Sequence, residues 1–156
     1  MSDKQSVSAS TTIAASPDSV YALVSDLPRM GEWSPEATGG EWVGGASGPA
    51  PGARFKGSNA QGKKKWKTTV TVTDASPSSR FAFINKVGPK TVAEWTYEIA
   101  PSGAGCTVTE TWTDGRGPVI GAIGKVLTGV DDRVAHTRSM IETTLAKIKQ
   151  AAESGA

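Results

Sequence analysis

The sequence predicts an α+β fold in which a curved antiparallel sheet of about seven strands surrounds one long C-terminal helix. Three observations support this prediction. Apolar side chains recur every three or four residues between residues 131 and 153, which is typical of an amphipathic helix. Apolar and polar side chains alternate through most of residues 38–114, as they do in half-buried strands. The turns between these strands are short, which favours antiparallel neighbours.

The C-terminal helix is predicted over residues 131–153. At a rise of about 1.5 Å per residue, about 20 residues make a rod of about 30 Å, which is the width of a small domain. Either Thr137 or Arg138 fills the one gap in its apolar stripe. Because nearly everything before it is predicted as strand, the helix should lie against a sheet. The stripe comprises Val130, Val134, Ile141, Leu145, Ile148 and Ala152.

The N-terminal part of the chain predicts one strand and two short helices. Residues 1–6 are polar and expected to be flexible, and alternation over residues 7–13 indicates the first strand. Ser16 is a suitable N-cap with Pro17 in the first turn, and the helix that follows should bury a stripe ending at Leu27. Prolines at both ends of residues 28–35 leave room for only a short second helix.

Six more strands are predicted between residues 38 and 114. Turns rich in Gly, Pro and Ser separate them, and the longest such connection spans residues 44–52. The order of strand, two helices, six strands and long helix is that of a helix-grip fold, with one domain over residues 7–153. The predicted strands cover residues 38–43, 54–59, 64–74, 80–86, 91–100 and 106–114.

Composition excludes several classes of protein. The 156 residues carry 17 Lys and Arg against 15 Asp and Glu, so the net charge of +2 gives no strong attraction to nucleic acid or to an anionic membrane. Cys106 has no partner for an internal disulfide, and no apolar run approaches the roughly 20 residues of a membrane span. We expect a soluble cytoplasmic protein, a monomer or homodimer, without stable membrane insertion, nucleic acid, metal or cofactor.

Three segments resemble a known family. They are Asp26-Leu27-Pro28-Arg29-Met30-Gly31-Glu32-Trp33-Ser34-Pro35, Arg54-Phe55-Lys56-Gly57-Ser58-Asn59, and the helix from His136 to Lys149. With the order of elements, they are similar to the polyketide cyclase/dehydrase branch of the START-like (SRPBCC) superfamily, as found in actinobacteria. The resemblance covers roughly residues 7–152. It implies a cavity between the sheet and the terminal helix, but the superfamily places many functions on this scaffold.

Glu110 is the first candidate for chemistry in that cavity. On its strand it shares a face with Cys106, Val108 and Trp112, so it should point inward, where an unpaired carboxylate is costly to ionise. One interpretation is structural: the carboxylate pairs with a cation, reaches water, or is turned outward by a bulge. The other makes Glu110 the polar anchor of a ligand cavity, with a raised pKa.

His136 is the only histidine and lies about one position off the apolar stripe of the C-terminal helix. It is either a boundary residue or a group at the cavity mouth that acts as an acid or base near neutral pH. Glu110 and His136 are therefore the catalytic candidates, and whether they meet is open.

Aromatic side chains are spread over the bend after the first helix and over most strands. Most should belong to the core, but tryptophans also suit a cavity for a flat apolar ligand. Gly57 leaves space beside Phe55 and Asn59 on one strand face, either for a ligand or for curvature. The predicted ligand-binding residues are Trp33, Phe55, Asn59, Trp66, Phe83, Trp95, Tyr97, Glu110, Trp112, His136 and Met140.

Two further segments have alternative interpretations. Residues 115–129 contain five glycines among apolar residues and form either a lead-in to the long helix or a mobile lid; their spacing does not match a phosphate-binding loop. The basic cluster at residues 63–67 contains Trp66, but alternation sends Lys65 and Lys67 outward. A solvated edge therefore explains it better than binding of single-stranded nucleic acid.

Binding of a small, largely apolar molecule, lipid-like or aromatic and polyketide-like, is the leading functional hypothesis. The alternatives are a polyketide cyclase or aromatase in which Glu110, His136 or Tyr97 moves protons, and a regulator of a protein partner whose cavity is vestigial. Binding ranks first because the sequence contains no obligate catalytic set.

Overall fold

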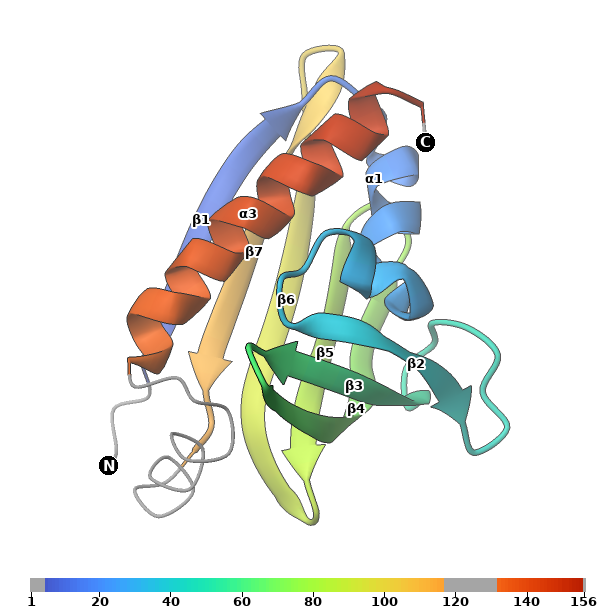
Figure 1. Ribbon diagram of the computed structural model, residues 1–156. Coiled ribbons are helices and arrows are strands. Elements are labelled where there is room, and N and C mark those ends of the chain that lie inside the picture. The colour runs from blue at the N-terminus through green and yellow to red at the C-terminus, as the bar shows by residue number, and fades with distance from the viewer. Residues whose placement is uncertain (1–4, 117–131, 156) are drawn as a thin grey trace.

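Seven strands form one antiparallel sheet in the order β1-β7-β6-β5-β4-β3-β2 (Figure 1). The computed structural model describes residues 5–116 and 132–155. Figure 1 shows the sheet curving around the C-terminal helix α3. The elements are β1 (Ser6–Ile13), α1 (Pro17–Val24), the 3-10 helix η1 (Leu27–Glu32), β2 (Ala37–Val43), β3 (Arg54–Gln61), β4 (Lys64–Ser76), β5 (Arg80–Val87), β6 (Lys90–Ser102), β7 (Gly105–Asp114) and α3 (Arg133–Glu153).

Alternation along β7 and β4 determines which face of these strands meets the core. Along β7 every second residue is buried, from Cys106 through Val108 and Glu110 to Trp112. The same period buries Val70 and Val72 on β4. The predicted fold class and strand faces are therefore confirmed.

The C-terminal helix α3 begins at Arg133, and Asp132 is its N-cap. The Asp132 side chain accepts a hydrogen bond from the Ala135 amide at 3.1 Å. Thr137, which is fully buried, fills the gap in the apolar stripe. At the other end the Lys149 ammonium donates to the Thr12 carbonyl at 2.6 Å, and the Ala14 amide donates to Glu153 at 2.8 Å. These contacts fasten α3 to the end of β1. Val130, predicted to open the stripe, lies outside the described residues.

The first helix is shorter than predicted. Ser16 caps α1 by accepting from the Ser19 amide at 3.1 Å, as expected, but α1 ends at Val24. Both the amide and the hydroxyl of Ser25 bond to the Tyr21 carbonyl, which closes the last turn. Leu27 is buried as predicted, although it belongs to η1.

Within the described residues, none of the helices combines the length and hydropathy needed to cross a bilayer.

Candidate functional site

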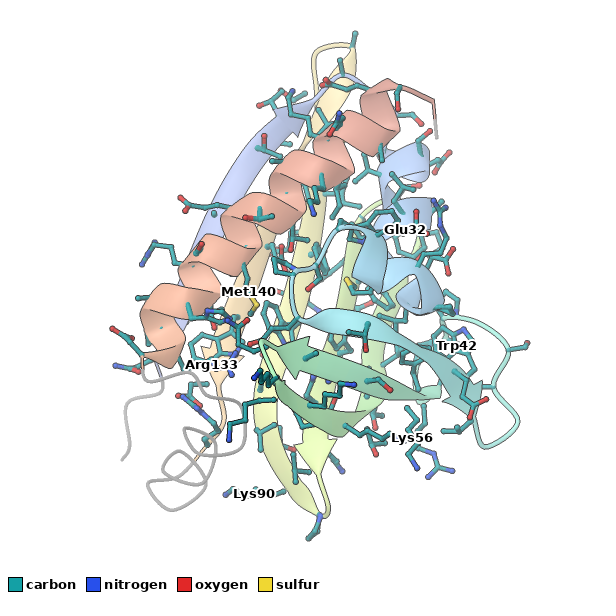
Figure 2. The ribbon with its side chains drawn as sticks, in the orientation of Figure 1. Glu32, Trp42, Lys56, Lys90, Arg133 and Met140 are labelled. Atoms are coloured by element: carbon teal, nitrogen blue, oxygen red, sulfur yellow. The ribbon has the colours of Figure 1, made fainter. Side chains whose placement is uncertain are left out.

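A cavity of about 290 Å³ lies between the concave face of the sheet, η1 and the first turns of α3. Figure 2 places Arg133 and Met140, both of which line it, at the beginning of α3. Six aromatic side chains contribute to its apolar wall, together with aliphatic ones such as Leu27 and Val70. The six are Phe55, Trp66, Phe83, Trp95, Tyr97 and Trp112.

The sheet bends at β2 to form one end of this cavity. A register shift interrupts the pairing of β2 with β3 between Ala37 and Gly39. Gly40 has a positive φ of 151°, and a side chain there would collide with the Lys56 carbonyl and the Phe55 ring. Glycine at position 40 therefore lets β2 cross closely over Phe55.

Nine of the eleven predicted ligand-binding residues line the cavity, and their binding role remains a prediction. Trp33 does not: it is buried in the core with the Arg29 guanidinium 5.2 Å from its ring centroid. His136 does not either, because its ring is turned toward Glu36. The nine are Phe55, Asn59, Trp66, Phe83, Trp95, Tyr97, Glu110, Trp112 and Met140.

Glu110 points into the cavity, with 2% of its surface exposed. The Tyr97 hydroxyl donates to its Oε2 at 2.9 Å, and no described residue hydrogen-bonds its Oε1. Regular pairing with Ala9 on one side and Tyr97 on the other excludes a bulge at this position. Neither a bulge nor a cation among the described residues therefore accounts for the buried carboxyl group.

Burial controls the protonation of this pair. It raises the pKa of Glu110 from 4.5 to about 8, although the Tyr97 hydrogen bond opposes the change. Burial, and then the negative charge of Glu110, raise the pKa of the Tyr97 phenol well above 10. Both groups are therefore neutral at pH 7. A neutral carboxyl group that accepts from Tyr97 through Oε2 retains a proton that no described residue accepts.

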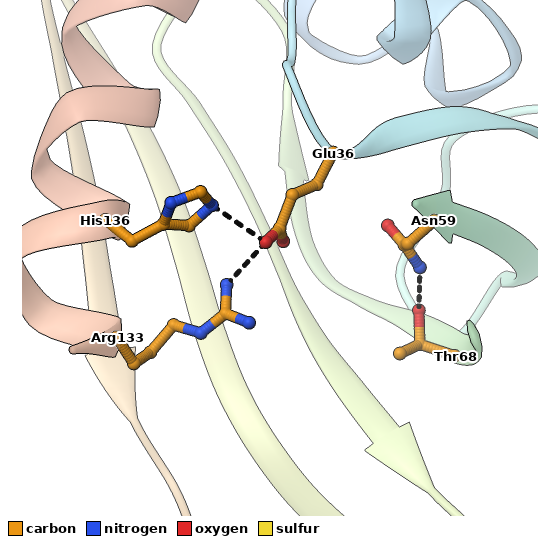
Figure 3. A network of polar contacts seen from close by, with 5 residues as sticks. All are labelled: Glu36, Asn59, Thr68, Arg133 and His136. Atoms are coloured by element: carbon orange, nitrogen blue, oxygen red, sulfur yellow. Dashed lines mark hydrogen bonds and ion pairs between the residues drawn. The ribbon is translucent and has the colours of Figure 1, made fainter. Parts of the chain in front are cut away.

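A charged cluster connects the start of β2 to α3. The Arg133 guanidinium and the His136 Nε2 atom both contact Oε2 of Glu36, at 2.8 and 3.0 Å (Figure 3). The Glu36 and Arg133 side chains are only 11% and 14% exposed, and both line the cavity. His136 contacts Glu36 but does not line the cavity. Of the two catalytic candidates, His136 therefore meets Glu36, and Glu110 meets Tyr97.

Glu36 was not among the predicted site residues. The available signal was weak: one acidic residue after Pro35, and an arginine and a histidine three positions apart on one side of α3.

We expect removal of this carboxylate to loosen the start of α3. Glu36→Ala should lower the free energy of unfolding by about 2 kcal/mol, because it leaves the half-buried Arg133 without its partner. The measurement is urea unfolding, with Glu32→Gln as the control. Glu32 pairs with Arg29 in solvent, where screening makes such a pair weak, so its removal should change little. Equal effects of the two substitutions would contradict a structural role for the Glu36 contact.

A second polar group in the wall is the amide cluster, which we define as Asn59 of β3, Thr68 of β4 and Asn85 of β5. The Nδ2 atoms of both asparagines lie 3.4 Å from the Thr68 hydroxyl oxygen. Thr68 is 8% exposed. Of the three, only Asn59 is among the predicted ligand-binding residues, because alternation within a strand does not show which strands share the cavity.

The predicted lid over residues 115–129 falls mostly outside the described residues. Of its beginning, Arg116 lines the cavity and donates to both carboxylate oxygens of Asp114, at 2.9 and 3.0 Å. Burial works to raise the pKa of Asp114, but these hydrogen bonds outweigh it and hold the pKa below its usual value. Whether the segment acts as a lid stays a prediction.

The lysines of the basic cluster point outward and the cysteine points inward, as predicted. The cluster does not lie on an edge strand, however, because both β3 and β5 pair with β4. Lys63, Lys64, Lys65 and Lys67 are exposed, whereas Trp66 is half-buried and lines the cavity. Cys106 is buried, which raises the pKa of its thiol. Across residues 5–116 and 132–155, no three His, Cys, Asp or Glu side chains gather closely enough to hold a metal ion.

A concave antiparallel sheet closed by a C-terminal helix around a cavity defines a helix-grip protein of the START-like class. The sequence model described as "Polyketide cyclase / dehydrase and lipid transport" matches residues 4–153, and the chain belongs to this family. The predicted resemblance is thereby confirmed. No curated protein sequence matches the chain significantly.

Solved structures share the fold. The chain is 30% identical to the Polyketide_cyc-like protein Cgl2372 from Corynebacterium glutamicum, with 99% of this chain and 95% of that one covered and a TM-score of 0.64. TTHA0849 from Thermus thermophilus is 20% identical, with 97% and 99% covered and a TM-score of 0.69. StfQ, a di-domain ARO/CYC protein from the steffimycin biosynthetic pathway, is 14% identical, with 96% and 51% covered and a TM-score of 0.73.

Proposed function

We propose that the protein binds one small, largely apolar molecule, aromatic or lipid-like, in the cavity between the sheet and α3. The observation that carries the proposal is the wall itself, in which six aromatic side chains surround a few convergent polar groups. Such a combination is typical of small-molecule sites. Family membership supports a ligand-binding or cyclase role.

The volume of the cavity limits the size of the ligand that it can hold. Small-molecule sites span roughly 300–1,000 Å³, and this cavity of about 290 Å³ lies at the lower end. Flat ring faces also favour a flat partner, because stacked and edge-to-face contacts add to the burial of apolar area. A compact molecule of a few fused rings fits these conditions better than a long acyl chain.

The test combines native mass spectrometry with a probe titration. Native mass spectrometry of freshly purified protein should show an additional mass if a ligand co-purifies. The fluorescent probe 2-naphthol should bind the emptied protein at one site. Ala93→Phe should weaken that binding at least about tenfold, because a phenyl ring at this buried position of β6 occupies the cavity.

Ala100→Phe is the matched control, since Ala100 lies on the same strand but is exposed. Circular dichroism establishes that both variants are folded. If Ala93→Phe remains folded and binds 2-naphthol as tightly as the wild type, the probe does not enter the cavity. That result would reject the proposal and leave the partner-regulator alternative.

A cyclase or aromatase is the second candidate, and the Glu110–Tyr97 pair favours it. A buried carboxyl group with a pKa of about 8 can take up or release a proton near neutral pH. In this candidate Glu110 holds the proton and Tyr97 orients the carboxyl group. Turnover of a reactive polyketone should then fall at least about a hundredfold in Glu110→Gln. Binding of 2-naphthol with no such turnover would leave the carrier function alone.

A further inference from the structure

The amide cluster contains a hydroxyl group whose neighbours are both donors. Asn59 and Asn85 direct their Nδ2 atoms at the oxygen of Thr68 from the flanking strands, and Figure 3 shows the contact from Asn59. At 3.4 Å both contacts are longer than ordinary N–H···O hydrogen bonds, which are about 2.7–3.2 Å. Because an amide nitrogen cannot accept, the Thr68 proton finds no acceptor in either contact.

The same cluster contains an acceptor without a donor. The Oδ1 atom of Asn85 is buried, and no described residue donates to it. Such an atom carries the full cost of its lost hydration. The Nδ2 atom of the same amide group contacts the Thr68 hydroxyl, so Oδ1 lies close to that hydroxyl as well. The cluster therefore holds one donor and one acceptor, close to each other, that lack partners among the described residues.

Gly57 leaves space in front of this pair. It is the register partner of Thr68 and also lines the cavity. A Cβ atom at position 57 would lie 3.7 Å from the Thr68 hydroxyl oxygen and 3.7 Å from the Phe55 ring, both ordinary contact distances. The absent side chain thus leaves the hydroxyl uncovered on this side, and a methyl group would contact it without a clash.

We propose that the amide cluster is a subsite for a neutral hydroxyl group of the ligand, which accepts from Thr68 and donates to Asn85. This inference rests on the proposed function and assigns the ligand to the hydroxylated aromatic molecules. A hydroxyl group can accept and donate at once, whereas a ketone or an ether only accepts and an ammonium group only donates. Of these groups, the hydroxyl is the one that satisfies both.

The experiment compares two probes with the same ring system, 2-naphthol and 2-methoxynaphthalene, by fluorescence titration of the wild type and four variants. The wild type should bind 2-naphthol at least about fivefold more tightly, which is the size of one added hydrogen bond. Thr68→Val removes the hydroxyl at almost constant shape and should bring the two affinities together. Gly57→Ala should lower the affinity for 2-naphthol by covering Thr68.

Thr69→Val is the control, because it changes the next residue, on the opposite face of β4, and should keep the preference for 2-naphthol. Glu110→Gln tests the competing possibility that the buried carboxyl group on β7, rather than the amide cluster, holds the ligand hydroxyl. Equal affinities of the wild type for both probes, or a preference lost in Glu110→Gln but kept in folded Thr68→Val and Gly57→Ala, would overturn the subsite while leaving cavity binding intact. If neither probe binds, the proposed function is contradicted, and the subsite proposal falls with it.

Discussion

Glu110→Gln should make the protein more stable than the wild type at pH 8 and similar to it near pH 4. In the folded chain burial raises the pKa of Glu110 to about 8, against 4.5 when it is exposed to water. Between these two values the folded state holds one proton more than the unfolded state. The free energy of unfolding therefore falls as pH rises, by about 1.4 kcal/mol per pH unit from this group.

The stabilisation by neutral Glu110 is complete below pH 4.5 and is lost as the pH rises toward about 8. Between pH 5 and pH 8 the wild type should lose roughly 3–4 kcal/mol relative to Glu110→Gln. The glutamine variant has no such titration, and its amide can still accept from Tyr97. Urea unfolding at several pH values measures the difference between the two proteins.

Glu98→Gln is the matched control for this prediction. Glu98 lies on the exposed face of β6, one residue after Tyr97, and its carboxylate is in solvent. This variant should follow the pH dependence of the wild type. Parallel curves for the wild type and Glu110→Gln would show that Glu110 is ionised in the folded protein and would remove the basis for a proton-holding role.

Ile148→Ala should lower the free energy of unfolding by about 3 kcal/mol, because it leaves a void in a close-packed part of the core. Ile148 is fully buried and belongs to the same core as Ile141 and Leu145, and none of the three lines the cavity. Urea unfolding measures the loss. Ile148→Val should cost about 1 kcal/mol, which makes the series graded.

Met140→Ala provides the contrast on the same helix. Met140 faces the cavity, so its truncation enlarges space that is already open and should cost less stability than Ile148→Ala. It should also change the affinity for 2-naphthol, whereas Ile148→Ala should not. If Ile148→Ala alters the affinity for the probe while Met140→Ala does not, the division of α3 into a cavity wall and a packed segment is wrong.

Local periodicity made much of the fold predictable. Successive side chains of a strand point to opposite faces, so alternation alone placed Glu110 and Tyr97 on the concave side of the sheet. The helical period predicted the buried stripe of α3 but left its gap to either Thr137 or Arg138, and the structure buries Thr137. Cap residues at Ser16 and Asp132 determine where two helices begin, since their side chains accept from amides only three residues ahead.

The same reasoning could not predict which inward-facing side chains meet. Glu36 and Arg133 are 97 positions apart in the chain, and Glu36 and His136 are 100 apart. Their contact depends on where α3 crosses the sheet and on the register shift in β2, neither of which has a local sequence period. Trp33 was misassigned for the same reason: an aromatic residue at a bend suits the core and a cavity equally well.

The sequence by itself determined the elements, the faces of the strands and the inward carboxyl group, because each depends on backbone geometry over a few residues. Only the tertiary structure decided that the concave face encloses a cavity, that Tyr97 holds Glu110, and that three strands bring Asn59, Thr68 and Asn85 together. Those features arise from the curvature of the sheet and the path of α3, which are set by contacts between residues far apart in the chain.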